Sequence, residues 1–333
     1  MEDFKSIQEF FFQCVKEKLP PNYSLVDDIA DRLNISNDSA YRRIRGETSL
    51  SFDEIQILSS QYDISIDTLF SLKSNSVSFT YRAINQDGFS FKDYLASVLQ
   101  NLTLMTQFEN KELIYAAKDI PLFHYFQCHE LTTFKIFFWM NMLEDSTGYF
   151  EHNFDFNQFD EESVSLAQSI WKAYTHVPSI EIWSNETINV TLRQIEYCWE
   201  CGLFKQKDQA ILLCEKMLEM ISHTQKQAEL GYKFENIKEA TSGSDNFKLY
   251  YNEITISDNT IFFIMDDTRI THITHNLMNI LTTTNERFSD QTERYLKQIL
   301  RKSSLISSVS EKERNKFFLK MKEKITQLME RIV

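Results

Sequence analysis

Glycine and proline are scarce in this chain, and that scarcity restricts the possible folds more than any other sequence feature. Only six glycines and four prolines occur in 333 residues. Because these two residue types form most tight turns, a fold made of many short strands and turns is disfavoured. We therefore predict long regular elements, mostly helices, and a mainly α fold class. A chain of this length is expected to form two or three domains.

The first 70 residues show the clearest organisation. Apolar residues recur at helical spacing in four segments, at residues 3–19, 24–33, 36–45 and 51–62. Asn34 and Gly46 stand at breaks between these segments, where a left-handed backbone is expected. Ser65 can cap a further short helix that carries Ile66. We predict a five-helix domain at residues 1–70.

The segment "NDSAYRRIRGETS", residues 37–49, is basic on one side. With Ala40 and Ile44 facing inward, helical geometry directs Arg42 away from the core. Small side chains at the start of a helix can approach base edges in the major groove, and arginine can bind guanine bidentately. The predicted base contacts are Asn37, Asp38, Ser39 and Arg42. The predicted phosphate contacts are Ser36, Tyr41, Arg43, Arg45 and Thr48.

These segments closely resemble the XRE-type, lambda-repressor-like helix-turn-helix domain of bacterial and phage regulators. "IADRLNIS" is similar to the second helix and its turn, "NDSAYRRIRG" to the recognition helix with its closing glycine, and "DISIDTLF" to the final helix. The resemblance spans residues 1–70, with Asn34 in place of the family's usual turn glycine. It implies a sequence-specific transcription regulator that places residues 36–45 in the major groove of double-stranded DNA.

The charge of the chain leaves an alternative open. The formal net charge is −13, and residues 1–70 alone hold 7 Lys and Arg against 13 Asp and Glu, a net of −6. So acidic a surface weakens non-specific binding to nucleic acid. The alternative hypothesis is a helical interaction or scaffold protein whose N-terminal module does not bind DNA.

The remaining residues divide into three predicted segments. Residues 71–78, half of them serine, predict a linker. Residues 79–247 predict a helical regulatory domain, whose many aromatic residues either form its core or line a pocket for an unidentified effector. Residues 248–333 predict C-terminal helices and a small three-stranded antiparallel β-meander, with strands at 248–256, 260–265 and 269–274.

Apolar residues at the end of the chain form a heptad seam. They are spaced three and four residues apart: Phe318, Met321, Ile325, Leu328 and Ile332. Such a seam either packs on its own domain or pairs with a second helix. We include these residues as dimerisation candidates and predict a homodimer, because one small DNA contact is usually too weak alone.

No motif in the sequence predicts an enzyme. Cys198 and Cys201 form a CxxC inside an apparent helix, with no second ligand pair at zinc-finger spacing, so we predict that they pack as apolar groups. His272 and His275 would point to opposite faces of a strand. No nucleotide-binding, hydrolase or metalloprotease signature occurs. We predict no catalytic residue, no metal and no cofactor.

The location of the protein is predicted from two stretches. The N-terminal "MEDFKSIQEFFFQC" carries acids where a secretory signal needs basic residues. The most apolar stretch, residues 131–143, is shorter than the roughly 20 residues of a membrane span and contains Lys135. We predict a cytoplasmic protein with no membrane partner, and a small molecule or a protein as effector.

Overall fold

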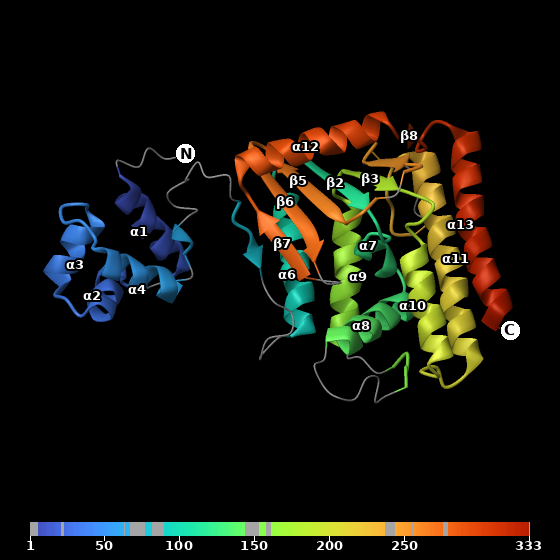
Figure 1. Ribbon diagram of the computed structural model, residues 1–333, viewed down its shortest axis with the longest axis horizontal. Coiled ribbons are helices and arrows are strands. Elements are labelled where there is room, and N and C mark those ends of the chain that lie inside the picture. Colours follow the sequence, from blue (N-terminus) through green and yellow to red (C-terminus); the bar gives the residue numbers. More distant parts are fainter. Residues whose placement is uncertain are drawn as a thin grey trace. The chain divides into compact units, whose positions relative to one another are not determined.

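The structure is a computed structural model. It describes residues 6–20, 23–62, 64–66, 77–81, 90–143, 153–157, 161–236, 244–254, 256–275 and 279–332. The chain divides into two compact units, which we call unit 1 (Met1–Ser78) and unit 2 (Phe79–Val333). Figure 1 labels the helices and strands of each unit. Residues 71–76 of the predicted linker lie outside the described residues.

Unit 1 is helical in its described part. Its helices are α1 (Ile7–Lys18), α2 (Leu25–Leu33), α3 (Asn37–Ile44) and α4 (Phe52–Tyr62), close to the four predicted segments. Serine side chains cap the first three helices by accepting a backbone N–H: Ser6, Ser24 and Ser36. Apolar side chains from all four helices form one core. Most of the predicted fifth helix lies outside the described residues.

The turn between α2 and α3 has the predicted backbone geometry. Asn34 is left-handed, with φ 53° and ψ 50°, and its N–H bonds back to carbonyls of α2. The side chain of Asn37 then donates to Asp27 Oδ1 at 2.7 Å, which ties the start of α3 to α2. Gly46, with φ +73°, ends α3 in the left-handed conformation that glycine adopts most readily.

Unit 2 contains an eight-stranded mixed sheet. Its strands are β1 (Thr80–Tyr81), β2 (Lys111–Ala117), β3 (Ser179–Trp183), β4 (Phe247–Tyr251), β5 (Thr260–Met265), β6 (Thr268–His275), β7 (Asn279–Thr283) and β8 (Ser304–Leu305). They lie in the order β1-β7-β6-β5-β2-β3-β4-β8. The three strands β2, β3 and β4 are parallel, and every other neighbouring pair is antiparallel.

Helices cover both faces of this sheet. They are α6 (Phe91–Met105), α7 (Leu122–Tyr125), α8 (His129–Leu143), α9 (Glu161–Thr175), α10 (Asn189–Glu200), α11 (Lys207–Leu230), α12 (Glu286–Arg301) and α13 (Glu311–Ile332). The chain passes from β2 to β3 through α7, α8 and α9, and from β3 to β4 through α10 and α11. Leu296 of α12 packs on one face, against Ile114 and Ile180, and the larger core occupies the other face (Figure 1).

The predicted mainly α fold with a three-stranded meander is wrong for unit 2. The sheet has eight strands, and β2 and β3 lie in segments for which no strand was predicted. Both strands are largely buried on both faces. The residues of β2 lack the alternation of apolar and polar side chains that marks a half-exposed strand, and β3 is only five residues long. Short apolar runs of this kind are easily assigned to helices or loops.

The sheet of unit 2 spans the predicted boundary at residue 247. β4 pairs with β3, and β5 pairs with β2, so residues on both sides of this point belong to one sheet. The antiparallel meander is formed by β5, β6 and β7, whereas β4 lies on the far side of β3. Strand β7 occupies a segment in which helices were predicted to resume.

The heptad seam of α13 packs inside unit 2. The five side chains from Phe318 to Ile332 are buried in the main core, where α13 packs against α11 (Figure 1). Of the two alternatives for this seam, packing on its own domain is the one observed. These side chains are therefore covered by their own chain, and a dimer would have to form through another surface.

Candidate nucleic-acid interface and ligand cavity

Helix α3 presents a polar outer face. Ala40 is fully buried and Ile44 packs partly buried against the core, so both face inward as their spacing predicted. The predicted contact residues that are exposed are Ser36, Asn37, Asp38, Tyr41, Arg42 and Arg45. Ser39 and Thr48 are half-buried. The outer face therefore combines small polar side chains at its start with two exposed guanidinium groups one turn later.

The two exposed arginines of this segment make only exposed ion pairs. Arg42 Nε lies 3.3 Å from Asp38 Oδ2, and Arg45 lies 3.5 Å from a carboxylate oxygen of Glu47. Arg45 also stands over the ring of Tyr41, 5.5 Å from its centroid. Exposed ion pairs of this kind contribute roughly 0–1 kcal/mol to stability. The two guanidinium groups can therefore exchange their carboxylate partners for another anion at little cost.

Arg43 has a different environment. It is half-buried, and its guanidinium lies 2.8 Å from Glu54 Oε1 of α4. Burial would raise the pKa of Glu54, but Arg43 and the Ser51 N–H outweigh it and hold that pKa below its usual value. Gln8 of α1 donates to the backbone carbonyls of Arg43 and Thr48. Arg43 thus anchors α3 to its own module, although its position predicted a phosphate contact.

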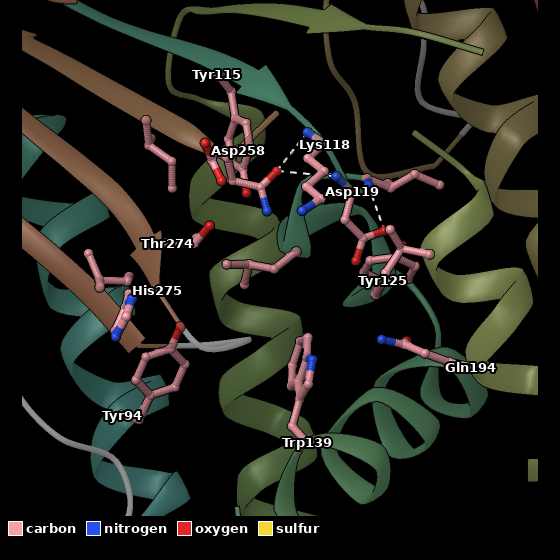
Figure 2. A pocket seen from close by; sticks show the side chains of 16 residues that line it. Tyr94, Tyr115, Lys118, Asp119, Tyr125, Trp139, Gln194, Asp258, Thr274 and His275 are labelled. Atoms are coloured by element: carbon pink, nitrogen blue, oxygen red, sulfur yellow. Dashed lines mark hydrogen bonds between the residues drawn. The ribbon is translucent and has the colours of Figure 1, made fainter. Parts of the chain in front are cut away.

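Unit 2 contains a cavity of about 350 Å³ at the carboxyl end of β2. Strand order changes direction there, because β3 follows on one side of β2 and β5 lies on the other. In open α/β sheets, such a point leaves a crevice in which ligands bind. Figure 2 shows Tyr115 entering from β2, Trp139 from α8 and Gln194 from α10. We call this space the β2 cavity.

Asn259 holds the edge of the β2 cavity in place. Its side-chain oxygen accepts hydrogen bonds from the backbone N–H groups of Lys118, at 2.8 Å, and Asp119, at 3.2 Å (Figure 2). The two bonds join the residues that follow β2 to those that precede β5. The bonds hold the backbone of Lys118 and Asp119, whose side chains line the cavity.

A buried lysine lies behind the wall of the cavity and bonds to two of the residues that line it, Asp119 and Gln194. Lys135 of α8 is fully buried, and its ammonium donates to Asp119 Oδ2 at 3.2 Å, Thr191 Oγ1 at 3.1 Å and Gln194 Oε1 at 2.9 Å. It also lies 4.4 Å from the centroid of the Tyr125 ring. Burial lowers the pKa of Lys135, and the Asp119 carboxylate opposes that effect.

The phenols of the cavity are neutral donors and acceptors. Burial raises the pKa of Tyr94 to about 12, and raises those of Tyr115 and Tyr125 well above their ordinary value. The Tyr125 hydroxyl donates to Asp119 Oδ1 at 2.9 Å. The hydroxyl groups of Tyr94 and Tyr115 make no hydrogen bond to another described residue.

A second charged cluster, centred on Glu181 of β3, is closed within the core. The Glu181 carboxylate accepts bonds from His124 Nε2 at 3.0 Å, from the Trp183 indole N–H at 2.7 Å, and from the Tyr174 hydroxyl. Burial would raise the pKa of Glu181, but His124 and these donors hold it below its usual value. Lys233 lies 3.7 Å from the Tyr174 ring centroid. None of these side chains lines the β2 cavity.

The cysteines and histidines considered from the sequence are dispersed. Cys198 is buried, and burial raises the pKa of its thiol to about 12, whereas Cys201 is exposed. His272 bonds to Thr282 within the sheet, and His275 lines the β2 cavity. Across the described ranges, no group of three or more His, Cys, Asp or Glu side chains could hold a metal ion.

No family model, no curated protein and no solved structure matches the chain. Within the described part of the chain, no helix combines the length and the apolar character needed to cross a membrane. The cytoplasmic location stays a prediction.

The β2 cavity was not located from the sequence. Its walls come from positions between Tyr94 and Ile280, which only the sheet brings together. One signal was present: Lys135 interrupts the apolar run "LTTFKIFFWM", and a lysine inside such a helix needs a buried partner. Of the aromatic residues, Trp139 lines the cavity and Trp183 lies fully in the core. An effector stays a prediction.

Proposed function

We propose that unit 1 is the DNA-reading module of a transcription regulator, with α3 in the major groove. The observation that carries this proposal is the outer face of α3, where small polar residues precede two exposed arginines behind a tight, left-handed turn. Two helices joined by three residues, with the second one open to solvent, are the arrangement that helix-turn-helix proteins use.

The side chains of α3 divide into three roles in this proposal. Arg42 binds a base edge, together with Asn37, Asp38 and Ser39. Tyr41 and Arg45 contact phosphates, with Ser36 and Thr48 at the ends of the segment. Arg43 is a positioning residue, because transferring its guanidinium to DNA would break the half-buried pair with Glu54.

The acidity of unit 1 predicts weak binding by a single copy. Residues 1–70 carry a net charge of −6, so the electrostatic attraction between this module and the phosphates of DNA is small. We therefore propose that two copies act on a symmetric site with half-sites about 34 Å apart. The surface that joins them is not the heptad seam of α13, which is covered in the core.

Selection on a random-sequence duplex library tests the proposal. We expect the full-length protein to enrich a two-fold symmetric site, and Arg42→Ala/Arg45→Ala to lose that enrichment. The matched control is Lys316→Ala/Lys320→Ala, which removes the same charge from exposed positions of α13 and should keep it. No enrichment by the unmodified protein at low salt would contradict the proposal.

A second candidate function is protein interaction through unit 1. It is favoured by the three arginines of the α3 segment, each of which already has a carboxylate partner within its own module. Under this alternative, the double arginine variant and the double lysine variant would behave alike on DNA, and neither would bind it.

A further inference from the structure

Three polar groups in the β2 cavity lack a hydrogen-bond partner among the described residues: the hydroxyls of Tyr94 and Tyr115 and the side-chain nitrogen of Gln194. Tyr115 is 2% exposed and Gln194 is 7% exposed. Figure 2 shows the three side chains converging from β2, α6 and α10. None of the three atoms is sealed from the cavity space, so a ligand can replace water as their hydrogen-bond partner.

The orientation of the Gln194 amide follows from its neighbour. Lys135 has only donors to offer, and it bonds to the side-chain oxygen of Gln194 at 2.9 Å. The NH₂ group of Gln194 is thereby left on the cavity side. The interior therefore presents a donor at Gln194 and two hydroxyls that can donate or accept.

Two opposite charges stand at the edge of the cavity. Lys118 follows β2 and Asp258 precedes β5, and both are exposed. Neither side chain makes a hydrogen bond or an ion pair with another described residue. With histidine counted as neutral, the charges of Lys118, Lys135, Asp119 and Asp258 cancel. A ligand without net charge preserves that balance, whereas a simple ion would leave a charge uncompensated in a partly buried site.

We propose that the β2 cavity binds a small zwitterion, an α-amino acid with an aromatic side chain. The carboxylate of the ligand pairs with Lys118 and its ammonium group pairs with Asp258. Its ring lies among Tyr94, Tyr115 and Trp139, where aromatic rings pack edge to face or offset. A hydroxyl on that ring, as in tyrosine, would bond to the Tyr115 hydroxyl or to the NH₂ group of Gln194. The cavity volume of about 350 Å³ fits a small molecule.

A purely cationic ligand fits this cavity less well, although aromatic walls and carboxylates often bind cations. The Lys135 ammonium already lies over the ring of Tyr125 and beside the Asp119 carboxylate. An additional cation beside these groups would be repelled by this like charge. A zwitterion avoids the conflict because its own carboxylate accompanies the ammonium group.

Calorimetric titration of the full-length protein tests this proposal, and it does not depend on DNA binding by unit 1. The probes are L-phenylalanine and L-tyrosine. Phenethylamine lacks the carboxylate, 3-phenylpropionate lacks the ammonium group, and adenosine is an uncharged planar molecule. We expect at least one of the two amino acids to bind, and each comparator to bind about tenfold more weakly or not at all, because each loses a charge-assisted hydrogen bond.

Conservative variants place the binding in the β2 cavity. Asp258→Asn removes one charge from an unpaired side chain, and Tyr115→Phe removes one hydroxyl while the ring stays. Asp258→Asn should weaken binding of either amino acid about tenfold, and Tyr115→Phe should weaken binding of L-tyrosine about tenfold. The matched control is Asp267→Asn, in the turn at the opposite end of β5, which should bind as the unmodified protein does.

Three results would overturn the proposal. The first is that neither amino acid gives heat of binding or a change in tryptophan fluorescence at millimolar concentration. The second is that phenethylamine or adenosine binds as tightly as the amino acid, which would exclude a zwitterion site. The third is binding that Asp258→Asn leaves unchanged, which would place the amino acid elsewhere.

Discussion

The two units place their charged side chains differently. In the described part of unit 1, every charged side chain reaches the surface, and the core is apolar apart from Ser59. Unit 2 buries His124, Lys135, Glu181 and Lys233 beside its sheet. Charges at the surface are available to a large partner, whereas buried charges must be satisfied internally or by a small ligand. This difference favours macromolecular contact through unit 1 and ligand contact through unit 2.

Within unit 2, the two charged clusters show a similar contrast. The carboxylate oxygens of Glu181 accept hydrogen bonds from His124, Trp183 and Tyr174. The cluster around Lys135 instead borders a cavity in which Gln194 still offers an unused donor. A cluster whose polar groups are all hydrogen-bonded to one another makes the core more rigid. A cluster with an unused donor beside a cavity can bind a ligand. Substitutions in each unit and each cluster therefore test these differences.

The largest effect is expected for Glu181→Ala. The substitution leaves His124 and Lys233 buried without their carboxylate, which should destabilise unit 2 by about 3–5 kcal/mol. All four tryptophans lie in unit 2, so tryptophan fluorescence during urea unfolding reports on this unit. A decrease in the free energy of unfolding below about 1 kcal/mol would contradict the assignment of a buried, fully hydrogen-bonded cluster around Glu181.

A pH dependence of unit 2 should follow from Lys233. Burial lowers the pKa of Lys233 to about 7, whereas the unfolded chain keeps the ordinary value of 10.5. Between these two values the unfolded state therefore binds more protons than the folded state. The free energy of unfolding should rise with pH through that window, by at most about 1.4 kcal/mol per pH unit. Unfolding of Lys233→Met by urea should lack this rise, and an identical pH profile would contradict the assignment.

A core substitution in unit 1 tests whether the two units are independent. Ile29 is fully buried, and Ile29→Ala should destabilise unit 1 by about 2–4 kcal/mol. Retention on a DNA duplex should fall, while the tryptophan-monitored unfolding of unit 2 stays the same. If the midpoint of the tryptophan-monitored unfolding also changes, then the stability of unit 2 depends on that of unit 1.

The smallest effect is expected at the turn before α3. Asn34 has a left-handed backbone, which costs a residue with a Cβ roughly 1–2 kcal/mol unless it is asparagine, aspartate or glycine. Asn34→Ala should therefore destabilise unit 1 by about 1 kcal/mol, and Asn34→Gly should be neutral or stabilising. Circular dichroism during thermal unfolding distinguishes the two. Equal midpoints would show that the turn relaxes.

The helices of unit 1 could be predicted from the sequence because their determinants are local. Ser24 and Ser36 cap helices a few residues away, and Asn34 turns the chain between them. The inward positions of Ala40 and Ile44 also follow from helical spacing alone. The pairing of Arg43 with Glu54 did not follow, because it depends on how α3 packs against α4.

The fold of unit 2 could not be predicted in the same way. The strand β5 was recognised because of its β-branched and aromatic run, but its partner β2 lies about 150 residues earlier in the chain and shows no alternation. Strand order depends on these long-range pairs, which leave little trace in a local window. The β2 cavity inherits that difficulty, since Asn259 and Lys118 become neighbours only in the sheet.

Photo-crosslinking is the most direct test of the proposed contact between α3 and DNA. A photoreactive phenylalanine derivative would replace Tyr41 on α3 or Tyr295 on α12, two tyrosines of similar exposure, 49% and 54%. We expect crosslinks to a duplex from position 41 and none from position 295. Equal crosslinking at both positions, or crosslinking from position 295 alone, would contradict that contact.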